Sequence, residues 1–298
     1  MREAAKGLRS KLDIIIRKGD KSSVYVVMKQ SDYFEKIGRI LLETSKFQHL
    51  TKDPTKDLRK KMSRLVTGTN NQQDIVKFPK VKGNYGPGYC YGTLKTHKAG
   101  NPLRPIISQM TSPTYRIGKV LNDLLAPYIP GHFSLKSAVE FIDLLHEKGP
   151  EDNIASLRKI SISLDRVYRS DKSPLPISED VLRDMLKAST MAAPFLSHQG
   201  KLFRQVARVA MRSPLGVLFA NVYMATIEER TFREYQKPKI YGRCIDDIFV
   251  TIKETDDDIK LTDALKRNSV LNFTTEHNQQ KTLPFLYVLV KQEEDSLK

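Results

Sequence analysis

The stretch YGRCIDDIFV, residues Tyr241–Val250, places two adjacent aspartates, Asp246 and Asp247, between two apolar runs. Each apolar run has the length of a short β-strand, so the stretch predicts a hairpin with the aspartates at its tip. Adjacent carboxylates repel each other, and in apolar surroundings they need a counterion. The pair is therefore either a solvated turn or a site that binds a cation.

A third carboxylate, Asp165, follows a predicted strand at Lys159–Leu164. Mg²⁺ prefers oxygen ligands and is usually bound by one or two carboxylates together with substrate phosphates. Three carboxylates at strand ends fit a two-metal site, in which one ion activates an attacking hydroxyl and the other holds a triphosphate. Asp-Asp is also common in turns, so the pair by itself leaves both interpretations open.

The charge of the chain is uneven. The 298 residues carry a formal net charge of +16. Residues 1–130 contain 25 Lys and Arg against 10 Asp and Glu, and the remainder contains 25 against 24. A basic first half beside a nearly neutral second half indicates that a polyanion binds to the first half. The alternative is a basic surface that only keeps the protein in solution.

Composition, apolar runs and cysteine content restrict the class of protein further. Apolar residues make up 40% and charged residues 28%, which is typical of a globular protein. No run of about 18 apolar residues predicts a membrane helix, and Met1–Ser10 is too polar for a signal peptide. Two distant cysteines, Cys90 and Cys244, predict a reducing compartment without a disulfide framework. We therefore expect an intracellular protein, nuclear or cytoplasmic, without a membrane partner.

Helices and strands are mixed without regular βαβ alternation, which predicts an α+β fold with an antiparallel sheet backed by helices. The expected helices are Asp32–Leu50, Thr55–Leu65, Ser137–Glu147, Thr255–Lys266 and one that starts at Ser213-Pro214. The expected strands are Tyr89–Leu94, Leu103–Gln109, Leu202–Val206, Leu271–Glu276 and Pro284–Val290. Gly68–Gly88 is rich in polar residues and is expected to be a loop.

Several motifs together resemble reverse transcriptases, and among them the Penelope-like retroelement branch. In chain order they are DIIIRKGDKSSVYVVM (Asp13–Met28), YGTLKTHK (Tyr91–Lys98), PLRPIIS (Pro102–Ser108), SISLD (Ser161–Asp165), SPLGVLFANVYM (Ser213–Met224), RCIDDIFV (Arg243–Val250) and LPFLYVLV (Leu283–Val290). Each motif is weakly specific, but their number and order are specific together.

The resemblance implies a fold of reverse-transcriptase fingers and palm, with an antiparallel palm sheet backed by helices and no thumb. It implies a basic N-terminal region over residues 1–85 and a fingers–palm domain over 86–298. Within that domain the fingers are expected at about 86–130 and the palm at about 155–298. The expected partners are an RNA template, a DNA primer and dNTPs, and no protein partner is evident.

The resemblance also assigns roles to individual residues. Asp165, Asp246 and Asp247 are expected to be catalytic and to bind Mg²⁺, or Mn²⁺ in its place. The residues expected to bind the nucleotide are Lys95, Lys98, Arg104 and Gln205. Cations at those positions would neutralise the triphosphate and the charge that develops on the leaving pyrophosphate.

The chain departs from the family pattern at functional positions. Arg208 and Arg212 stand where the family commonly has glycines, and Ser170 stands where it usually has an aromatic residue. Cys244 and Tyr287 also differ from the common residues. The leading function is RNA-directed DNA polymerase, by two-metal nucleotidyl transfer. The alternative is a catalytically inactive, nucleic-acid-binding remnant of a retroelement, and the two arginines predict weak or no extension with retained binding.

Overall fold

The computed structural model describes residues 7, 13–20, 23–43, 45–81, 83–96, 99–129, 133–148, 156–163, 176–206, 209–210, 212–252, 257–277, 281–293 and 296–297. The chain divides into two compact units. The N-terminal unit comprises Met1–Leu125 and Ser173–Gly216, and the C-terminal unit comprises Ala126–Lys172 and Val217–Lys298. Among the described helices none is long and apolar enough to span a membrane.

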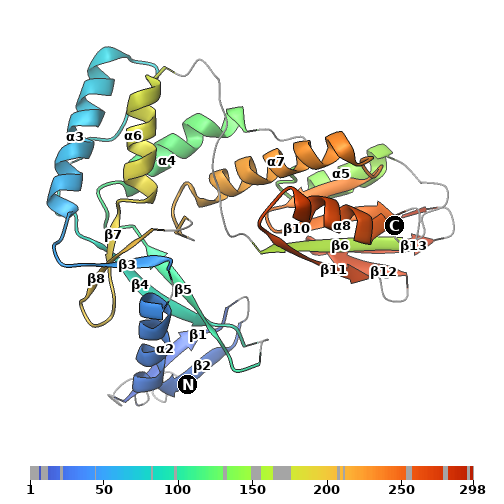
Figure 1. Ribbon diagram of the computed structural model, residues 1–298, viewed down its shortest axis with the longest axis horizontal. Helices are drawn as coiled ribbons and strands as arrows, with labels where there is room; N and C mark the ends of the chain where they lie inside the picture. Colours follow the sequence, from blue (N-terminus) through green and yellow to red (C-terminus); the bar gives the residue numbers. More distant parts are fainter. Residues whose placement is uncertain are drawn as a thin grey trace. The chain divides into compact units, whose positions relative to one another are not determined.

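The N-terminal unit is built on a five-stranded mixed sheet in the order β3-β8-β7-β4-β5 (Figure 1). The strands are β3 (Phe47–Leu50), β4 (Gly88–Leu94), β5 (Leu103–Ser108), β7 (Pro194–Leu196) and β8 (Leu202–Gln205). Strands β4 and β7 pair in parallel, and the other neighbours pair antiparallel. Residues alternate along β4, so that Cys90 and Leu94 are buried while Tyr89 and Tyr91 lie on the opposite face.

Helix α2 (Gln30–Glu43) covers the buried face of this sheet with Tyr33, Ile37 and Leu41. The Tyr33 hydroxyl donates to the carbonyl of Gly92 at 3.1 Å and accepts from its amide at 2.7 Å. Lys95 donates to Pro102, so alternation along the ladder makes Gly92–Pro105 a pair without mutual hydrogen bonds. The amide and carbonyl of Gly92 therefore point away from β5, and the Tyr33 hydroxyl satisfies both. Strands β1 (Ile14–Lys18) and β2 (Tyr25–Lys29) form an antiparallel hairpin that adds apolar side chains to the same core.

Three helices form the rest of the N-terminal unit. They are α3 (Thr55–Gln72), α4 (Tyr115–Leu125) and α6 (Glu179–Thr190). Helix α6 contacts both α3 and α4, and α3 and α6 run side by side in Figure 1. Their facing side chains are apolar and buried, including Met62, Leu121 and Met185, so this group is held together by the hydrophobic effect.

The C-terminal unit is built on a four-stranded antiparallel sheet in the order β11-β6-β10-β9. The strands are β6 (Ser156–Ser163), β9 (Tyr241–Cys244), β10 (Asp247–Ile252) and β11 (Asn272–His277). Around the sheet lie η1 (Ala126–Tyr128), α5 (Ala138–Lys148), α7 (Gly216–Glu234), α8 (Asp257–Arg267), β12 (Thr282–Phe285), β13 (Val288–Glu293) and β14 (Ser296–Leu297).

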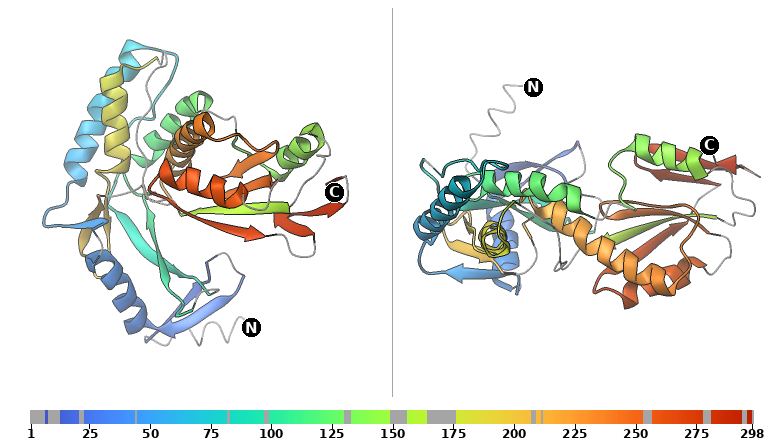
Figure 2. Two further views of the ribbon diagram at one scale, coloured as in Figure 1. Left: turned by 45° about the vertical axis from the view of Figure 1, so that its right-hand side comes forward. Right: turned by 90° about the horizontal axis from the view of Figure 1, so that it is seen from above.

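Both faces of this sheet are covered. Ile248, Val250 and Ile252 of β10 pack against α7 and α8. Phe249, from the alternate face, packs against Phe141 of α5 and against the β12–β13 hairpin. In the right-hand view of Figure 2 the strands lie between α5 and α8. A strand covered on both faces is expected to be apolar throughout, and β10 after Asp247 contains mainly Ile, Phe and Val.

The structure confirms most of the expected elements and corrects three of them. Phe47–Leu50 was expected to continue a helix, but it is strand β3, because its backbone pairs with β8. Helix α3 continues to Gln72, seven residues beyond the expected end at Leu65. The strand expected at Pro284–Val290 is a hairpin, β12–β13, which turns at Leu286 and Tyr287 with φ of 49° and 66°.

Candidate functional site

The β9–β10 hairpin carries the aspartate pair at its tip. Cys244 pairs with Asp247, so Ile245 and Asp246 form a two-residue loop. Ile245 has a φ of 55°, in the left-handed region. Positive φ at the first loop position is typical of a type II′ turn, where glycine is the usual residue. A β-branched side chain there is strained, at a cost of about 1–3 kcal/mol.

A buried polar cluster supports this hairpin from β9 and α7. Arg243 and Glu228 each have about 1% of the side chain exposed, and the Arg243 Nε donates to Glu228 Oε1 at 2.7 Å. The second nitrogen of the guanidinium, Nη1, donates to Asn221 at 3.0 Å. Tyr241 also donates its hydroxyl to Glu228 Oε1, at 3.0 Å. Burial raises the pKa of Glu228, while the Arg243 charge opposes that rise and favours the carboxylate.

The other edge of β9 is held by the segment before α5. The amide of Arg243 donates to Phe133 at 2.7 Å, and its carbonyl accepts from Leu135 at 2.7 Å. A Cβ at Gly242 would lie 2.7 Å from Leu135 Cδ1, so a larger residue there would have to displace this leucine side chain. The hairpin is thus fixed by backbone pairing on both sides and by a buried ion pair below.

The third expected carboxylate, Asp165, lies outside the described residues. Strand β6 ends at Ser163, two residues before it, and Ser161 of β6 pairs with Asp247. The C-terminal end of β6 therefore lies at the same end of the sheet as the tip of the β9–β10 hairpin. Within the described ranges no group of three or more His, Cys, Asp or Glu residues is close enough to hold a metal ion. Convergence of the three aspartates stays a prediction.

The residues present at the tip fit a hard divalent cation. Asp246 and Asp247 are half-buried, and no described cation forms an ion pair with Asp246. Burial raises the pKa of the neighbouring Cys244 thiol, and the charges of Asp247 and Asp246 raise it further. The tip therefore carries a concentrated negative potential with oxygen ligands, which is the environment that Mg²⁺ prefers.

The basic residues expected at the nucleotide lie in the N-terminal unit, around the β4–β5 hairpin. Lys95 is half-buried, and its amide donates to the carbonyl of Pro102 at 3.0 Å, which closes the hairpin loop. The loop turns at Gly100 and Asn101, with φ of 74° and 43°. Lys98 falls outside the described residues.

Arg104 is engaged in a contact that the sequence did not reveal. Its Nη1 lies 3.1 Å from Asp20 Oδ2 and 3.4 Å from Oδ1. The amide of Asp20 in turn donates to the carbonyl of Leu94 at 2.7 Å. Arg104 thus ties the loop after β1 to the β4–β5 hairpin, and a triphosphate would compete with Asp20 for this guanidinium.

Gln205 and Arg212 lie in the same unit. Gln205 is buried, with 9% exposed, and is the last residue of β8, paired with Phe47. The guanidinium of Arg212 lies over the ring of Tyr91, 5.8 Å from its centroid, in a cation–π contact. Arg208 is outside the described part of the chain.

An aromatic face of β4 was missed at the sequence level. Tyr89 and Tyr91 point to the outer face of the strand and stack with ring centroids 5.9 Å apart. Exposed aromatic rings of this kind are surfaces on which nucleobases can stack, and Arg212 covers part of the Tyr91 ring. The signal was present as period-two alternation in GYCYGTL, where every second residue is polar or aromatic.

The sequence matches no protein-family model and no curated protein. Solved structures are similar in fold. Telomerase from Candida albicans, in complex with a TWJ fragment of telomeric RNA, aligns over 99% of this chain and 55% of its own, with a TM-score of 0.59 and 10% identity. Apo telomerase from Candida tropicalis, truncated from the C-terminal domain, aligns over 95% of this chain and 63% of its own, with a TM-score of 0.52 and 11% identity.

Telomerase is a reverse transcriptase, so the chain has a reverse-transcriptase-like fold. The chain spans between 55% and 63% of the length of these telomerases. At this level of identity the similarity shows the fold alone.

Proposed function

We propose that the chain is the RNA-directed DNA polymerase domain of a Penelope-like retroelement. The observation that carries the proposal is the Asp246–Asp247 pair at a strained hairpin tip, within a reverse-transcriptase-like fold. The buried Arg243–Glu228 pair below the tip supports it, because such support preorganises the carboxylates. A solvated turn would need neither the strain nor the buried charges.

In the proposed reaction the 3′-oxygen of a DNA primer attacks the α-phosphorus of a dNTP. A new P–O bond forms, and the bond to pyrophosphate breaks. Asp246 and Asp247 would hold the metal, together with Asp165, which follows β6 by two residues in the sequence. Mg²⁺ bound there supplies charge that favours the ionised 3′-hydroxyl and neutralises the triphosphate. The RNA template selects the dNTP by base pairing.

The chain's own cations act on the nucleotide in this proposal. Lys95 follows β4, and Lys98 lies three residues further along the sequence; both would neutralise charge that develops on pyrophosphate. Arg104 would do so only after exchange from Asp20, so its contribution is coupled to the loop after β1. Gln205 is buried at the end of β8 and would line the base pair rather than contact phosphate.

Primer extension on an RNA template, with Mg²⁺ and with Mn²⁺, tests the proposal. Asp246→Asn keeps the size of the side chain and removes its charge. We expect it to lower extension by about three orders of magnitude, since metal charge stabilises the transition state by several kcal/mol. Lys201→Gln, on the surface of the N-terminal unit, is the charge-loss control. Extension that survives Asp246→Asn would contradict the proposal.

A catalytically inactive nucleic-acid-binding protein is the second candidate, and the position of Arg212 favours it. A guanidinium over Tyr91 occupies a face on which a base could stack. Replacing Arg208 and Arg212 by glycine should raise extension if these side chains obstruct the template. If neither the natural chain nor this variant extends a primer while both bind RNA, the second candidate is the function.

A further inference from the structure

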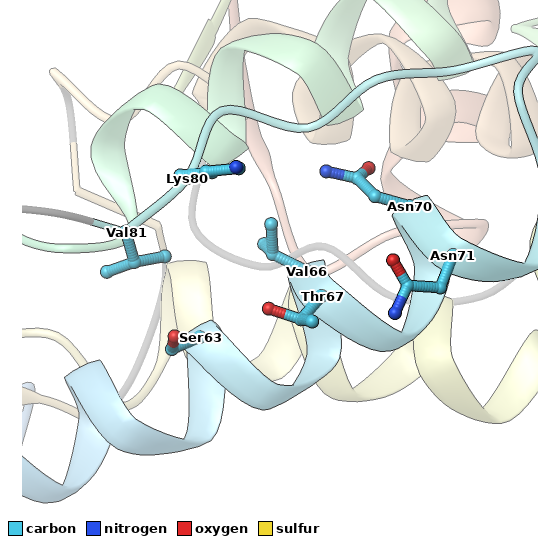
Figure 3. A pocket seen from close by; sticks show the side chains of 7 residues that line it. All are labelled: Ser63, Val66, Thr67, Asn70, Asn71, Lys80 and Val81. Carbon is cyan, nitrogen blue, oxygen red and sulfur yellow. The ribbon is translucent and has the colours of Figure 1, made fainter.

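A groove with a volume of about 310 Å³ lies in the N-terminal unit between helix α3 and the segment that follows it (Figure 3). Ser63, Thr67 and Asn71 line one wall. They are spaced four residues apart, so they form a single stripe along the helix. Lys80 stands on the opposite wall, and Val66 forms the buried floor.

Two side-chain amides hold the walls together. Asn70 donates to the carbonyl of Phe78 and accepts from its amide, both at 2.9 Å. Gln73 does the same with Val76, at 2.6 and 2.8 Å. Phe78 itself is buried, with 3% exposed. The second wall is therefore fixed by four hydrogen bonds to backbone and one apolar anchor, and the groove is preorganised for a ligand.

The surroundings of the groove are strongly basic. Residues 55–81 contain seven Lys and Arg against two Asp. One of these aspartates, Asp74, is paired with Lys77. Lys60 and Arg64 are exposed and lie on α3 next to the lining stripe. No carboxylate is among the described residues that line the groove. An anion in the groove would therefore meet cations on both sides.

We propose that this groove binds the sugar–phosphate backbone of a single-stranded RNA. Phosphates would contact Lys80 on one wall and Arg64 beside the other, because Lys and Arg are the usual partners of phosphate oxygens. Thr67 and Asn71 can both donate and accept hydrogen bonds, and so can a ribose 2′-hydroxyl. The inference goes beyond the proposed polymerase reaction, since a chain without catalysis would retain this site.

The lining argues against other ligands. Its described residues include no aromatic side chain on which a base could stack, so recognition is of the backbone and independent of sequence. Among the same residues, a small apolar ligand would contact two apolar side chains, Val66 and Val81. A single phosphate would contact few of the cations beside the groove. An RNA strand that runs along α3 would instead meet Lys60, Arg64 and Thr67 in turn.

The test is fluorescence anisotropy of a labelled, unstructured RNA with the full chain, and of DNA with the same sequence. Arg64→Gln/Lys80→Gln should weaken RNA binding about tenfold at low salt, because two phosphate contacts are lost. The slope of log K against log salt should fall by about 1.4, at about 0.7 per phosphate on a single strand. Lys80→Gln alone changes one exposed side chain and should give about half of the change in slope.

Lys201→Gln is the matched control, since it removes an exposed lysine of the same unit away from the groove. Thr67→Val/Asn71→Ala should lower RNA affinity about fivefold for each lost hydrogen bond and leave DNA affinity unchanged. Equal RNA affinity in Arg64→Gln/Lys80→Gln and the control would overturn the site. Equal loss for RNA and DNA in Thr67→Val/Asn71→Ala would overturn the assignment to RNA.

Primer extension by the same variants separates this inference from the proposed function. Arg64→Gln/Lys80→Gln should raise the template concentration needed for half-maximal extension about tenfold, because two phosphate contacts to the template are lost. Asp246→Asn should bind RNA normally and fail to extend. Loss of extension in Asp246→Asn together with unchanged RNA binding in the groove variants would uphold the polymerase and reject the groove.

Discussion

Two antiparallel hairpins carry the aspartates expected to be catalytic and the cations Lys95 and Arg104 expected at the nucleotide, and they are supported in different ways. The β9–β10 hairpin of the C-terminal unit presents Asp246 and Asp247 from a two-residue loop. The β4–β5 hairpin of the N-terminal unit presents basic residues from a longer loop, closed between Lys95 and Pro102. The short loop of the β9–β10 hairpin holds its aspartates in one arrangement. The longer loop of the β4–β5 hairpin fixes its basic side chains less tightly.

The ion pairs beneath the two hairpins show the difference most clearly. The Arg243–Glu228 pair is about 1% exposed, while the Arg104–Asp20 pair has side chains that are 25% and 12% exposed. A buried ion pair loses hydration and adds little net stability over an apolar pair. Its value here is positional, because the guanidinium fixes β9 next to the turn that carries Asp246 and Asp247. A partly exposed pair can exchange its partner, as binding of a triphosphate to Arg104 would require.

The largest expected effect comes from breaking the buried pair. Arg243→Met leaves Glu228 buried without its cation and should lower the free energy of unfolding by about 3–5 kcal/mol. Arg104→Met should lower it by about 1 kcal/mol, since its pair is partly solvated. Urea denaturation of both variants measures the difference.

The double variant Arg243→Met/Glu228→Gln removes the unpaired charge and keeps an acceptor for Tyr241. It should recover most of the lost stability but not primer extension, because the hairpin is then no longer held by a guanidinium. Equal stability losses in Arg243→Met and Arg104→Met would show that the two hairpins do not differ as described.

A matched pair of glycines gives the next effect. A Cβ at Gly242 would lie 2.7 Å from Leu135 Cδ1, and one at Gly92 would lie 2.8 Å from Leu103 Cδ2. Both contacts involve the ends of leucine side chains, so Gly242→Ala and Gly92→Ala should each lower the free energy of unfolding by about 1–3 kcal/mol.

Primer-extension rates should differ between Gly242→Ala and Gly92→Ala. Gly242→Ala displaces β9, the strand that leads into the turn with Asp246, and a shift of about 1 Å can lower a rate about 100-fold. Gly92→Ala changes a strand that carries none of the expected metal ligands and should reduce extension less. The same loss of extension in both variants would contradict the positional role of β9.

The loop residues with positive φ predict a smaller change in the free energy of unfolding, and here the substitution should stabilise the protein. Ile245→Gly relieves left-handed strain on a β-branched residue and should raise the free energy of unfolding by about 0.5–1 kcal/mol, after the entropy of glycine is subtracted. Asn101→Gly should change it by about zero, because asparagine tolerates this region. Thermal unfolding measures both, and a destabilised Ile245→Gly would show that the side chain, 44% exposed, makes contacts worth more than its strain.

The sequence predicted what depends on local pattern. Alternation and turn residues located β4, β5, β9 and β10, and the position of Asp246 and Asp247 at a hairpin tip followed from them. Phe47–Leu50 was placed in a helix because its pattern fits a short helix or a strand equally well, and only its pairing with β8 decides. Long-range pairing of this kind leaves no local signal.

The buried partners were also hidden from the sequence. Glu228 stands in the sequence beside the charged residues Glu229 and Arg230 and is fifteen positions from Arg243, so nothing in the local sequence marks it as the buried partner. Arg104 and Asp20 are eighty-four positions apart. Arg104 therefore was expected to face a nucleotide, whereas in the structure it contacts a carboxylate. The groove on α3 required the backbone of 76–81 to be in place, which composition does not indicate.

The smallest expected effect is on the pH dependence of stability, to which one buried titratable group in each unit contributes. Burial lowers the pKa of His198, whose ring stacks on Phe34 with centroids 3.6 Å apart, whereas burial raises the pKa of Glu228. The lowered native pKa means that the unfolded chain takes up the His198 proton more readily as the pH falls below 6.5, so stability falls as the pH drops through this region. Glu228 acts in the opposite sense, because its native pKa is raised and its contribution to stability falls as the pH rises above 4.5.

His198→Phe keeps the stacked ring and removes the titration, so the decrease in melting temperature between pH 7.5 and 5.5 should become smaller. After discounting for solvent screening, the difference should be about a few tenths of a kcal/mol. An unchanged pH dependence in His198→Phe, with the natural chain as reference, would show that His198 titrates alike in both states.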